Sequence, residues 1–206
     1  MSKGLLIAFE GIDGTGKSTQ LSLLATHLRQ QGYTVVETRE PTNGPYGQEI
    51  RALYQNRHQV SREQELELFL LDRHQHVEEC IVPALEHGKI VLTDRYYFST
   101  AAYQGAAGCD PAVIFTRNSF APEPDLVLLL TMSAGESVAR IRELRGEALN
   151  DFEQQDQLEK VAALFASFPH GCIVRINAAR SVQGVQASIR EAVRQMFAKK
   201  GIECAG

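Results

Sequence analysis

A glycine-rich phosphate loop lies close to the start of the chain. Residues 11–18 read Gly-Ile-Asp-Gly-Thr-Gly-Lys-Ser and complete the pattern G-x-x-x-x-G-K-S/T. The apolar run Leu5–Phe9 precedes the loop and predicts a buried strand, and after the loop apolar residues recur at helical spacing, at Leu21, Leu24, Ala25 and Leu28. A strand, this loop and a helix in that order predict a site for a nucleoside triphosphate.

The residue types of the loop suit the binding of phosphates. Its glycines let successive backbone N–H groups turn toward phosphate oxygens, and the helix that follows adds its positive end. Lys17 would reach the outer phosphates, and the Ser18 hydroxyl can ligate Mg²⁺. We therefore assign the triphosphate to Gly11, Ile12, Asp13, Gly14, Thr15, Gly16, Lys17, Ser18 and Thr19.

Composition argues against several other classes of function. With 206 residues, 44% of them hydrophobic, the chain fits a single domain, 1–206, with a substantial core. A formal net charge of -4 argues against a surface for nucleic-acid polymers. The four cysteines form no C-x-x-C pair, so we expect free thiols in a reducing cytoplasm. No apolar stretch reaches about 18 residues and the N-terminus shows no cleavable signal pattern, so we expect no membrane partner.

Strand and helix patterns alternate along the rest of the chain. Helical periodicity predicts helices at 61–85, at 138–145 and at the C-terminal end, whereas two prolines and two glycines make 41–47 a shaped loop. Apolar runs predict further strands at 33–36, 89–93, 126–130 and 172–176. Continuous apolar runs are typical of parallel strands buried on both faces. We therefore expect an α/β fold of the P-loop NTPase type, a three-layer sandwich with a parallel sheet of about five strands and helices on both faces.

Polar residues follow two of the predicted strands, where sheets of this kind bind ligands. One strand delivers Asp94 and Arg95, and another delivers Arg39, Glu40 and Pro41. Asp94 is placed like the acid that orients Mg²⁺ in P-loop proteins, although an acid that caps the next helix gives the same pattern. The Arg95 guanidinium can hold a second phosphate through two parallel hydrogen bonds.

A predicted helix carries an aromatic residue and an arginine four residues apart. Phe69 and Arg73 lie one turn apart on one helical face, where a ring can stack on a planar base and a guanidinium can bind its carbonyl. The alternative is a core phenylalanine beside a solvated arginine. A polar cluster follows later in the chain at Ser99, Thr100, Tyr103 and Gln104.

Three segments together resemble the signatures of the thymidylate kinase family. They are residues 9–20, 38–41 and 94–105, and the pair Phe69 and Arg73 before Gln75 is similar to a fourth signature. The resemblance implies transfer of the γ-phosphoryl group of ATP to dTMP with Mg²⁺, giving dTDP and ADP on the way to dTTP. It also implies that the partners are small nucleotides and that the chain forms a homodimer, for which the apolar positions of 66–81 offer a helix face, although a core explains them equally well.

The resemblance implies a role for each matched residue. Phe69 would stack on thymine, Arg73 would bind its carbonyl, and Tyr103 would crowd the ribose 2′ position. Arg95 and Arg51 would hold the acceptor phosphate. The implied acceptor site comprises Glu40, Pro41, Arg51, Phe69, Arg73, Arg95, Ser99, Thr100, Tyr103 and Gln104, and the implied metal ligands are Ser18 and Asp94.

A small helical lid is implied at about 140–153. Arg140 would bind ATP there, and because Gly14 and Thr15 offer no cation, the catalytic arginine would be Arg142 or Arg145, although a solvated helix face gives the same spacing. The implied catalytic residues are thus Lys17, Asp13, Arg95, Arg142 and Arg145.

The chain departs from the family pattern near this lid. Residues 150–153 read Asn-Asp-Phe-Glu where Asp-Arg-x-Glu is usual, Ala162 and Phe165 replace an arginine and a tyrosine, and the loop after Pro41 lacks the Gly-Gly-Thr form. Two alternatives therefore stay open. The chain is a kinase of another nucleoside or deoxynucleoside monophosphate, or it is a nucleotide-binding protein with impaired transfer.

Overall fold

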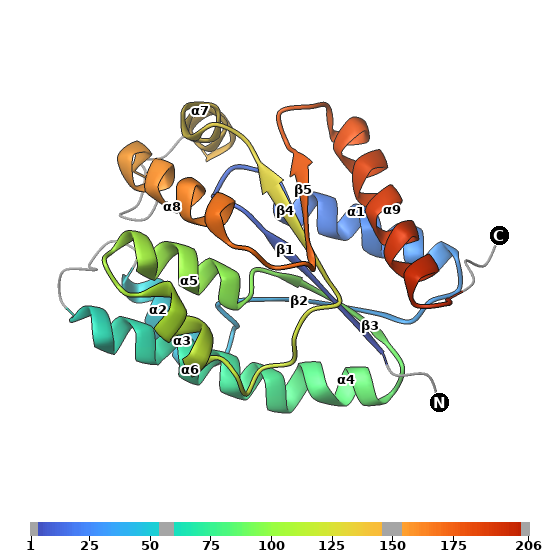
Figure 1. Cartoon of the computed structure of the whole chain (residues 1–206), viewed down its shortest axis with the longest axis horizontal. Coiled ribbons are helices and arrows are strands. Elements are labelled where there is room, and N and C mark those ends of the chain that lie inside the picture. The colour runs from blue at the N-terminus through green and yellow to red at the C-terminus, as the bar shows by residue number, and fades with distance from the viewer. Residues whose placement is uncertain (1–3, 54–59, 146–153, 203–206) are drawn as a thin grey trace.

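A five-stranded parallel sheet forms the centre of the molecule. The computed structural model describes residues 4–53, 60–145 and 154–202. Within these residues the strand order is β2-β3-β1-β4-β5, and all four neighbouring pairs are parallel. The strands are β1 (Leu5–Glu10), β2 (Val35–Arg39), β3 (Ile90–Asp94), β4 (Leu126–Thr131) and β5 (Ile173–Asn177). The predicted parallel α/β sheet is confirmed (Figure 1).

Helices cover both faces of this sheet. One face packs on α1 (Lys17–Gln30) and α9 (Val182–Lys199), as Figure 1 shows in blue and red. The other face packs on a layer formed by α3 (Arg62–His76), the π-helical segment η3 (Val77–Ile81), α4 (Val82–Glu86), α5 (Tyr97–Ala106), α6 (Pro111–Arg117) and α8 (Gln155–Ser167). The remaining described helices are α2 (Pro45–Ala52) and α7 (Ala134–Arg145).

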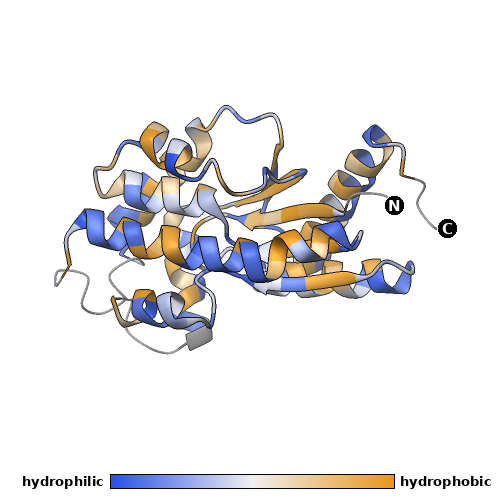
Figure 2. Cartoon of the chain, turned by 90° about the horizontal axis from the view of Figure 1, so that it is seen from below, coloured by the Kyte–Doolittle hydropathy of each residue, from blue (hydrophilic) through white to orange (hydrophobic). Residues whose placement is uncertain are grey.

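Alternate residues of β1 explain why three layers form. Leu5, Ile7 and Phe9 belong to the core shared with α1 and α9, whereas Leu6 and Ala8 belong to the core on the opposite face. Because both faces are covered, β1 is buried along its whole length. Figure 2 shows apolar residues in orange along the strands and polar residues in blue on the helices. Among the described helices, none is long and apolar enough to cross a membrane.

Two predicted boundaries are wrong near β2. The strand begins at Val35 and reaches Arg39 instead of covering 33–36, because at the edge of the sheet only Val35 is fully buried and hydrophobicity marks the strand poorly. The loop predicted at 41–47 ends at Gly44, and α2 begins at Pro45. Proline suits a first helical turn because its missing N–H would have no partner there.

The long helix predicted at 61–85 is confirmed as a continuous helical segment. Ser61 and Gln64 form a capping box at its start, since each side chain accepts a hydrogen bond from the other residue's backbone N–H. The segment passes through η3 and ends with α4 at Glu86. Predicted strands and helices elsewhere agree with the structure apart from small shifts at their ends.

Strand register gathers the sequence motifs at one edge of the sheet. Phe9 and Arg39 both pair with Asp94, so β1, β2 and β3 end side by side. The backbone N–H of Arg95 donates to Phe9 O at 2.9 Å, and that of Glu40 donates to Asp94 O at 3.0 Å. The phosphate loop, Glu40 and Arg95 therefore emerge from adjacent strands into a common site.

Candidate active site

The phosphate loop adopts a tight turn that only glycine permits at key positions. Gly11, Gly14 and Gly16 all have positive φ angles. A Cβ at Gly14 would lie 2.7 Å from the carbonyl oxygen of Ser137, and one at Gly11 would collide with that of Leu130. The Ser137 hydroxyl donates to the backbone oxygen of Asp13 and thereby fastens α7 to the loop. Helix α1 begins directly after the loop at Lys17, so its positive end faces the turn.

Lys17 is buried inside the turn. Its Nζ donates to the carbonyl oxygens of Gly11 and Ile12, both at 3.0 Å. Burial, together with the nearby Arg95 guanidinium, lowers the pKa of Lys17 to about 8 although Asp13 and Asp94 oppose the shift. An anion bound in the loop would compensate this buried positive charge.

Ser18 and Asp94 meet at the mouth of the turn. The Ser18 hydroxyl donates to Asp94 Oδ2, and Asp94 Oδ1 is buried with no hydrogen-bond partner. Asp94 does not cap the next helix, because the residue in that position is Tyr96. The described residues hold no cluster of three or more metal-binding side chains. One hydroxyl and one carboxylate with a free oxygen fit Mg²⁺, which takes most of its ligands from substrate phosphates and water.

Arg95 lies at the centre of a second polar group. Its Nη2 donates to Asp13 Oδ1 at 2.5 Å and to the Tyr103 hydroxyl at 3.3 Å, and its Nη1 donates to Ser99 Oγ at 2.9 Å. The Tyr103 hydroxyl in turn donates to Asp13 Oδ2 at 2.8 Å. Arg95 is the one described non-glycine residue with a positive φ, 74°, a conformation that usually costs free energy and clusters at functional sites.

The charges of this group are strongly coupled. Burial alone would raise the pKa of the Asp13 carboxyl, but Arg95, Lys17 and the Tyr103 hydroxyl outweigh burial and lower it to about 2. The pKa of Arg95 lies well above its usual value, because Asp13 and other acids outweigh its burial. Arg95 thus stays cationic, and in this structure the Asp13 carboxylate occupies the place where a phosphate could bind it.

Arg73 is the centre of a third, fully buried group. Its side chain is 1% exposed, so the alternative of a solvated arginine is wrong. Nε and Nη2 donate to Glu40 Oε2 at 2.9 and 2.5 Å, and Nη1 donates to Asn118 Oδ1 at 2.6 Å. Nη2 also donates to Thr100 Oγ1 at 2.9 Å. Burial opposes ionisation of Glu40, but Arg73 and His76 outweigh it and lower the pKa of Glu40.

Other predicted acceptor residues lie on α3, α5 and α2. Phe69 lies one turn earlier on α3 and is half-buried. Gln104 lies one turn after Thr100 on α5; its Nε2 donates to Glu65 Oε1 at 2.9 Å, and its buried Oε1 has no hydrogen-bond partner. Arg51 on α2 donates to the carbonyl oxygen of Pro41 at 3.2 Å.

A cavity of about 520 Å³ opens at the carboxyl ends of β2 and β3. Its lining includes Ser18, Asp94, Arg39, Gln75 and His76. Of the described residues that we assign to the acceptor base, none lines this cavity.

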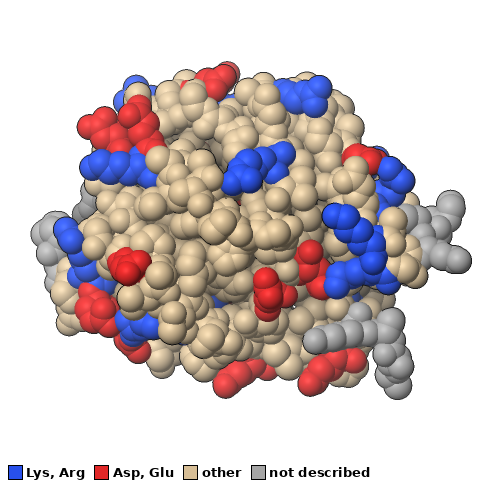
Figure 3. Space-filling view, in the orientation of Figure 1, with Lys and Arg blue, Asp and Glu red and all other residues tan. Residues whose placement is uncertain are grey.

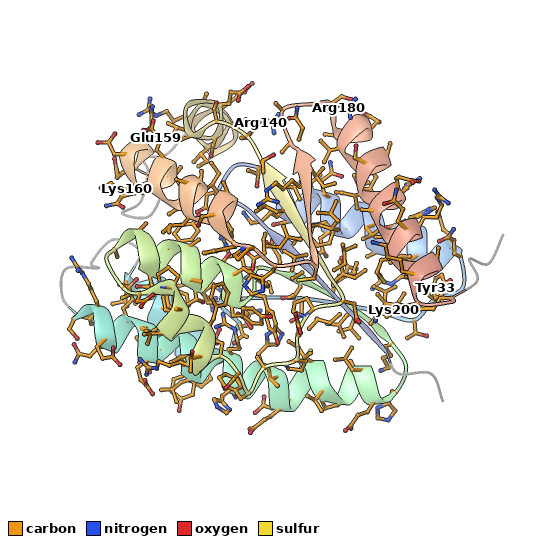
Figure 4. All side chains as sticks on the ribbon, viewed as in Figure 1. Tyr33, Arg140, Glu159, Lys160, Arg180 and Lys200 are labelled. Atoms are coloured by element: carbon orange, nitrogen blue, oxygen red, sulfur yellow. The ribbon has the colours of Figure 1, made fainter. Side chains whose placement is uncertain are left out.

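The lid arginines lie only partly within the described structure. Arg140 on α7 is half-buried and Arg142 is exposed. The side chain of Arg145, and residues 146–153 of the predicted lid, lie outside the described residues. Figure 4 labels Arg140 on α7 and Arg180 near the start of α9, at the end of the molecule where β4 and β5 finish.

Comparison with known proteins identifies the family of this chain. A sequence model of the thymidylate kinase family matches residues 9–189. The chain belongs to the thymidylate kinase family. A thymidylate kinase of Desulfotalea psychrophila is 54% identical over 194 residues, which are 94% of this chain and 96% of that protein. One of Xanthomonas campestris pv. campestris is 51% identical over 164 residues, covering 80% of this chain and 71% of that protein.

Several residues around the site have no clear signal in the sequence. Asn118, from the turn after α6, binds Arg73 across 45 positions of chain, and no local pattern marks it. Glu65 and His76 are buried on α3 like core residues. Glu10 has one signal, since an acid ends an otherwise apolar buried strand. Burial raises the pKa of its carboxyl to about 7, against the opposing effects of Ser99 and Arg95.

Proposed function

We propose that this chain transfers the γ-phosphoryl group of ATP to dTMP and forms dTDP and ADP. The observation that carries this proposal is a pair of cationic phosphate sites at adjoining strand ends. The phosphate loop with Lys17 follows β1, Arg95 follows β3, and Asp13 contacts Arg95 between them. Such a pair suits a donor triphosphate and an acceptor monophosphate held face to face.

The reaction needs no nucleophile from the protein. An oxygen of the dTMP phosphate attacks the γ-phosphorus, and the bond from that phosphorus to the β,γ-bridging oxygen breaks to leave ADP. In our assignment Lys17 and the loop N–H groups stabilise charge on the donor phosphates, while Arg95 exchanges Asp13 for the acceptor phosphate. Asp13 is then available to the acceptor sugar or the metal-bound phosphates.

Purified protein tests this assignment directly. Incubation with ATP, Mg²⁺ and each common nucleoside monophosphate should give diphosphate formation fastest with dTMP. Clear transfer to another acceptor and none to dTMP would refute the assignment of dTMP as substrate. Intact ATP binding without transfer to any acceptor would favour a nucleotide-binding protein with impaired transfer. Neither alternative is favoured, because the similar relatives are named thymidylate kinases.

We assign the acceptor base to the residues around Arg73. Phe69 supplies a stacking surface, the Arg73 group supplies donors for a carbonyl oxygen, and the unpartnered Oε1 of Gln104 can accept from a ring N–H. Thymine offers both a carbonyl oxygen and a ring N–H, whereas cytosine lacks the N–H. Thr100, Glu40 and Pro41 complete this part of the proposed site. Ser99 belongs to the phosphate part through its contact with Arg95, and Tyr103 faces the sugar.

Replacement of the stacking residue should act on acceptor binding. Phe69→Ala should raise the KM for dTMP by about tenfold to a hundredfold, since base–aromatic stacking contributes about 1–3 kcal/mol. The KM for ATP should stay within about twofold. Steady-state kinetics with each substrate varied in turn measures both values. Phe120→Ala is a matched control, because this ring stacks on His74 outside the proposed site; equal effects of the two variants would contradict the assignment.

We assign Mg²⁺ to Ser18 and Asp94. The unpartnered Oδ1 of Asp94 supports this assignment. A bound Mg²⁺ neutralises charge on the donor phosphates. Asp94→Asn should raise the Mg²⁺ concentration needed for half-maximal transfer, and an unchanged requirement would refute the assignment.

The lid cations, Arg140, Arg142 and Arg145, are proposed to bind the donor phosphates on closure of 140–153. Each arginine is replaced by alanine in turn, and the replacement that lowers kcat identifies the catalytic arginine. Three unchanged kcat values would show that no lid arginine is catalytic.

The wider partners are also proposals. We propose a homodimer, and since Leu66, Leu70, Val77 and Ile81 are core residues, its contact would use the partly buried Leu68 and Leu71 on α3. Sedimentation at low concentration tests this.

We propose a cytoplasmic protein that binds no nucleic-acid polymer, since Cys80, Cys109 and Cys172 are free and the two signs of charge mix on the face in Figure 3. Cell fractionation and gel-shift assays test these two points.

A further inference from the structure

Glu10 ends strand β1 directly before the phosphate loop and is completely buried. Burial of a carboxylate is costly unless hydrogen bonds compensate it. Glu10 accepts three of them. Oε1 accepts from the backbone N–H groups of Tyr96 at 2.9 Å and Ser99 at 3.2 Å, and Oε2 accepts from Ser99 Oγ at 2.5 Å. None of these donors belongs to the phosphate loop itself.

All three donors lie just after Arg95, in the turn and in the first turn of α5. Tyr96 precedes the first residue of α5 and its own side chain provides no cap, so Glu10 caps this helix from a neighbouring strand. The same turn is fastened by Arg95 N–H to Phe9 O and by Thr93 Oγ1 to Arg95 O at 2.8 Å. These bonds offset the cost of the positive φ at Arg95.

Ser99 extends this connection to the guanidinium of Arg95. A serine hydroxyl has a single proton. Because that proton goes to Glu10, the Ser99 oxygen is left as an acceptor, and Arg95 Nη1 donates to it at 2.9 Å. Glu10 thus determines how Ser99 is oriented, and Ser99 fixes one side of the guanidinium. The other nitrogen, Nη2, carries the bond to Asp13, which the acceptor phosphate would replace.

We propose that Glu10 is a positioning residue for the acceptor phosphate. It holds Arg95 in place through Ser99 and touches neither nucleotide. The proposal rests on the proposed function, because it takes Arg95 as the ligand of the dTMP phosphate. The role differs from a stabilising one. A residue that only stabilised the fold would affect all ligands alike, whereas a residue acting on Arg95 affects only ligands with a phosphate at that place.

Binding of dTMP and of thymidine, which lacks the phosphate, separates the two roles. Full-length Glu10→Gln and Ser99→Ala proteins should each bind dTMP about tenfold more weakly, as for loss of a hydrogen bond to a charged group. Thymidine should bind each variant within about twofold of the unchanged protein, and the KM for ATP should stay unchanged. The double variant should lose no more affinity for dTMP than the more strongly affected single variant, since both changes break the same chain of contacts.

Calorimetric titration provides these affinities, with Ser61→Ala as the matched control. Ser61 caps α3 by a similar serine hydrogen bond far from Arg95. Ser61→Ala should leave the ratio of the affinity for dTMP to the affinity for thymidine unchanged. Equal weakening of dTMP and thymidine, unchanged dTMP binding, or additive losses in the double variant would each overturn the proposal. If Glu10→Gln does not fold, Ser99→Ala still tests the contact through which Glu10 would act, and unchanged dTMP binding by that variant would overturn the proposal. Failure of the proposed function would instead show as absent dTMP transfer by the unchanged protein.

Discussion

Lys17→Met should reduce kcat for dTMP phosphorylation by about a thousandfold. The Lys17 ammonium is the positive side chain inside the phosphate loop, and loss of one preorganised donor at a developing charge costs about 10²- to 10³-fold, more where the donor also carries full charge. Its two present partners are backbone carbonyl oxygens 3.0 Å away, and in our assignment phosphate oxygens take their place.

The same change should not weaken the fold. Burial lowers the pKa of Lys17 to about 8, so the folded protein holds its proton less tightly than the unfolded chain does. The buried charge therefore opposes folding at neutral pH, and an apolar methionine removes this cost. We expect an unchanged or higher Tm together with the loss of activity. Lys199→Met, at an exposed position in the last turn of α9, should change neither. A lowered Tm for Lys17→Met, or kcat within tenfold of the unchanged protein, would contradict the assigned role.

The central strands could be predicted from the sequence, whereas the edge strands could be predicted only approximately. β1, β3 and β4 have apolar neighbours on both faces, so hydrophobicity alone marks them. β2 and β5 lie at the edges with polar, exposed residues, and their predicted ends shift by one to three positions. Helix α2 was missed because Pro45 and Gly47 in its first turn, together with Pro41 and Gly44 before it, predict a loop.

The position and the turn of the phosphate loop could be predicted because its pattern is local. Eight consecutive residues supply the glycines, the lysine and the hydroxyl, and their function depends on backbone geometry. Residues of the second site come from separate elements that meet only in the fold. Arg73 shows the difference. The spacing predicts that Arg73 lies beside Phe69. Its burial depends on two partners from other elements, Glu40 after β2 and Asn118 after α6, which accept its hydrogen bonds. No pattern along one helix carries that information.

Arg95→Ala should reduce kcat/KM for dTMP by about 10²- to 10³-fold with little change in the KM for ATP. The guanidinium is held by Ser99 and Tyr103 and has Asp13 where the acceptor phosphate is assigned, so its loss removes the charge-assisted hydrogen bonds to that phosphate. Arg95→Lys should recover only part of the loss, because an ammonium cannot form two parallel bonds. Arg117→Ala, which breaks two exposed ion pairs on α6, serves as the control and should leave kcat/KM unchanged. Equal losses for both alanine variants would exclude a specific role.

The loss of Arg95 should also change how stability depends on pH. In the folded protein the pKa of Asp13 is lowered to about 2 from 3.8, so its ionised form contributes stability above about pH 4 that disappears as the pH falls toward 2. Loss of Arg95 removes the largest of the effects that oppose burial, so the pKa of Asp13 should rise. The free energy of unfolding of Arg95→Ala should then lie below that of the unchanged protein at pH 7. The difference should shrink as the pH falls, because Asp13 becomes neutral first in the folded variant and that protonation favours its folded state. Denaturant titrations between pH 3 and pH 7 measure this difference, and a constant difference across that range would show that Asp13 and Arg95 are not coupled in solution.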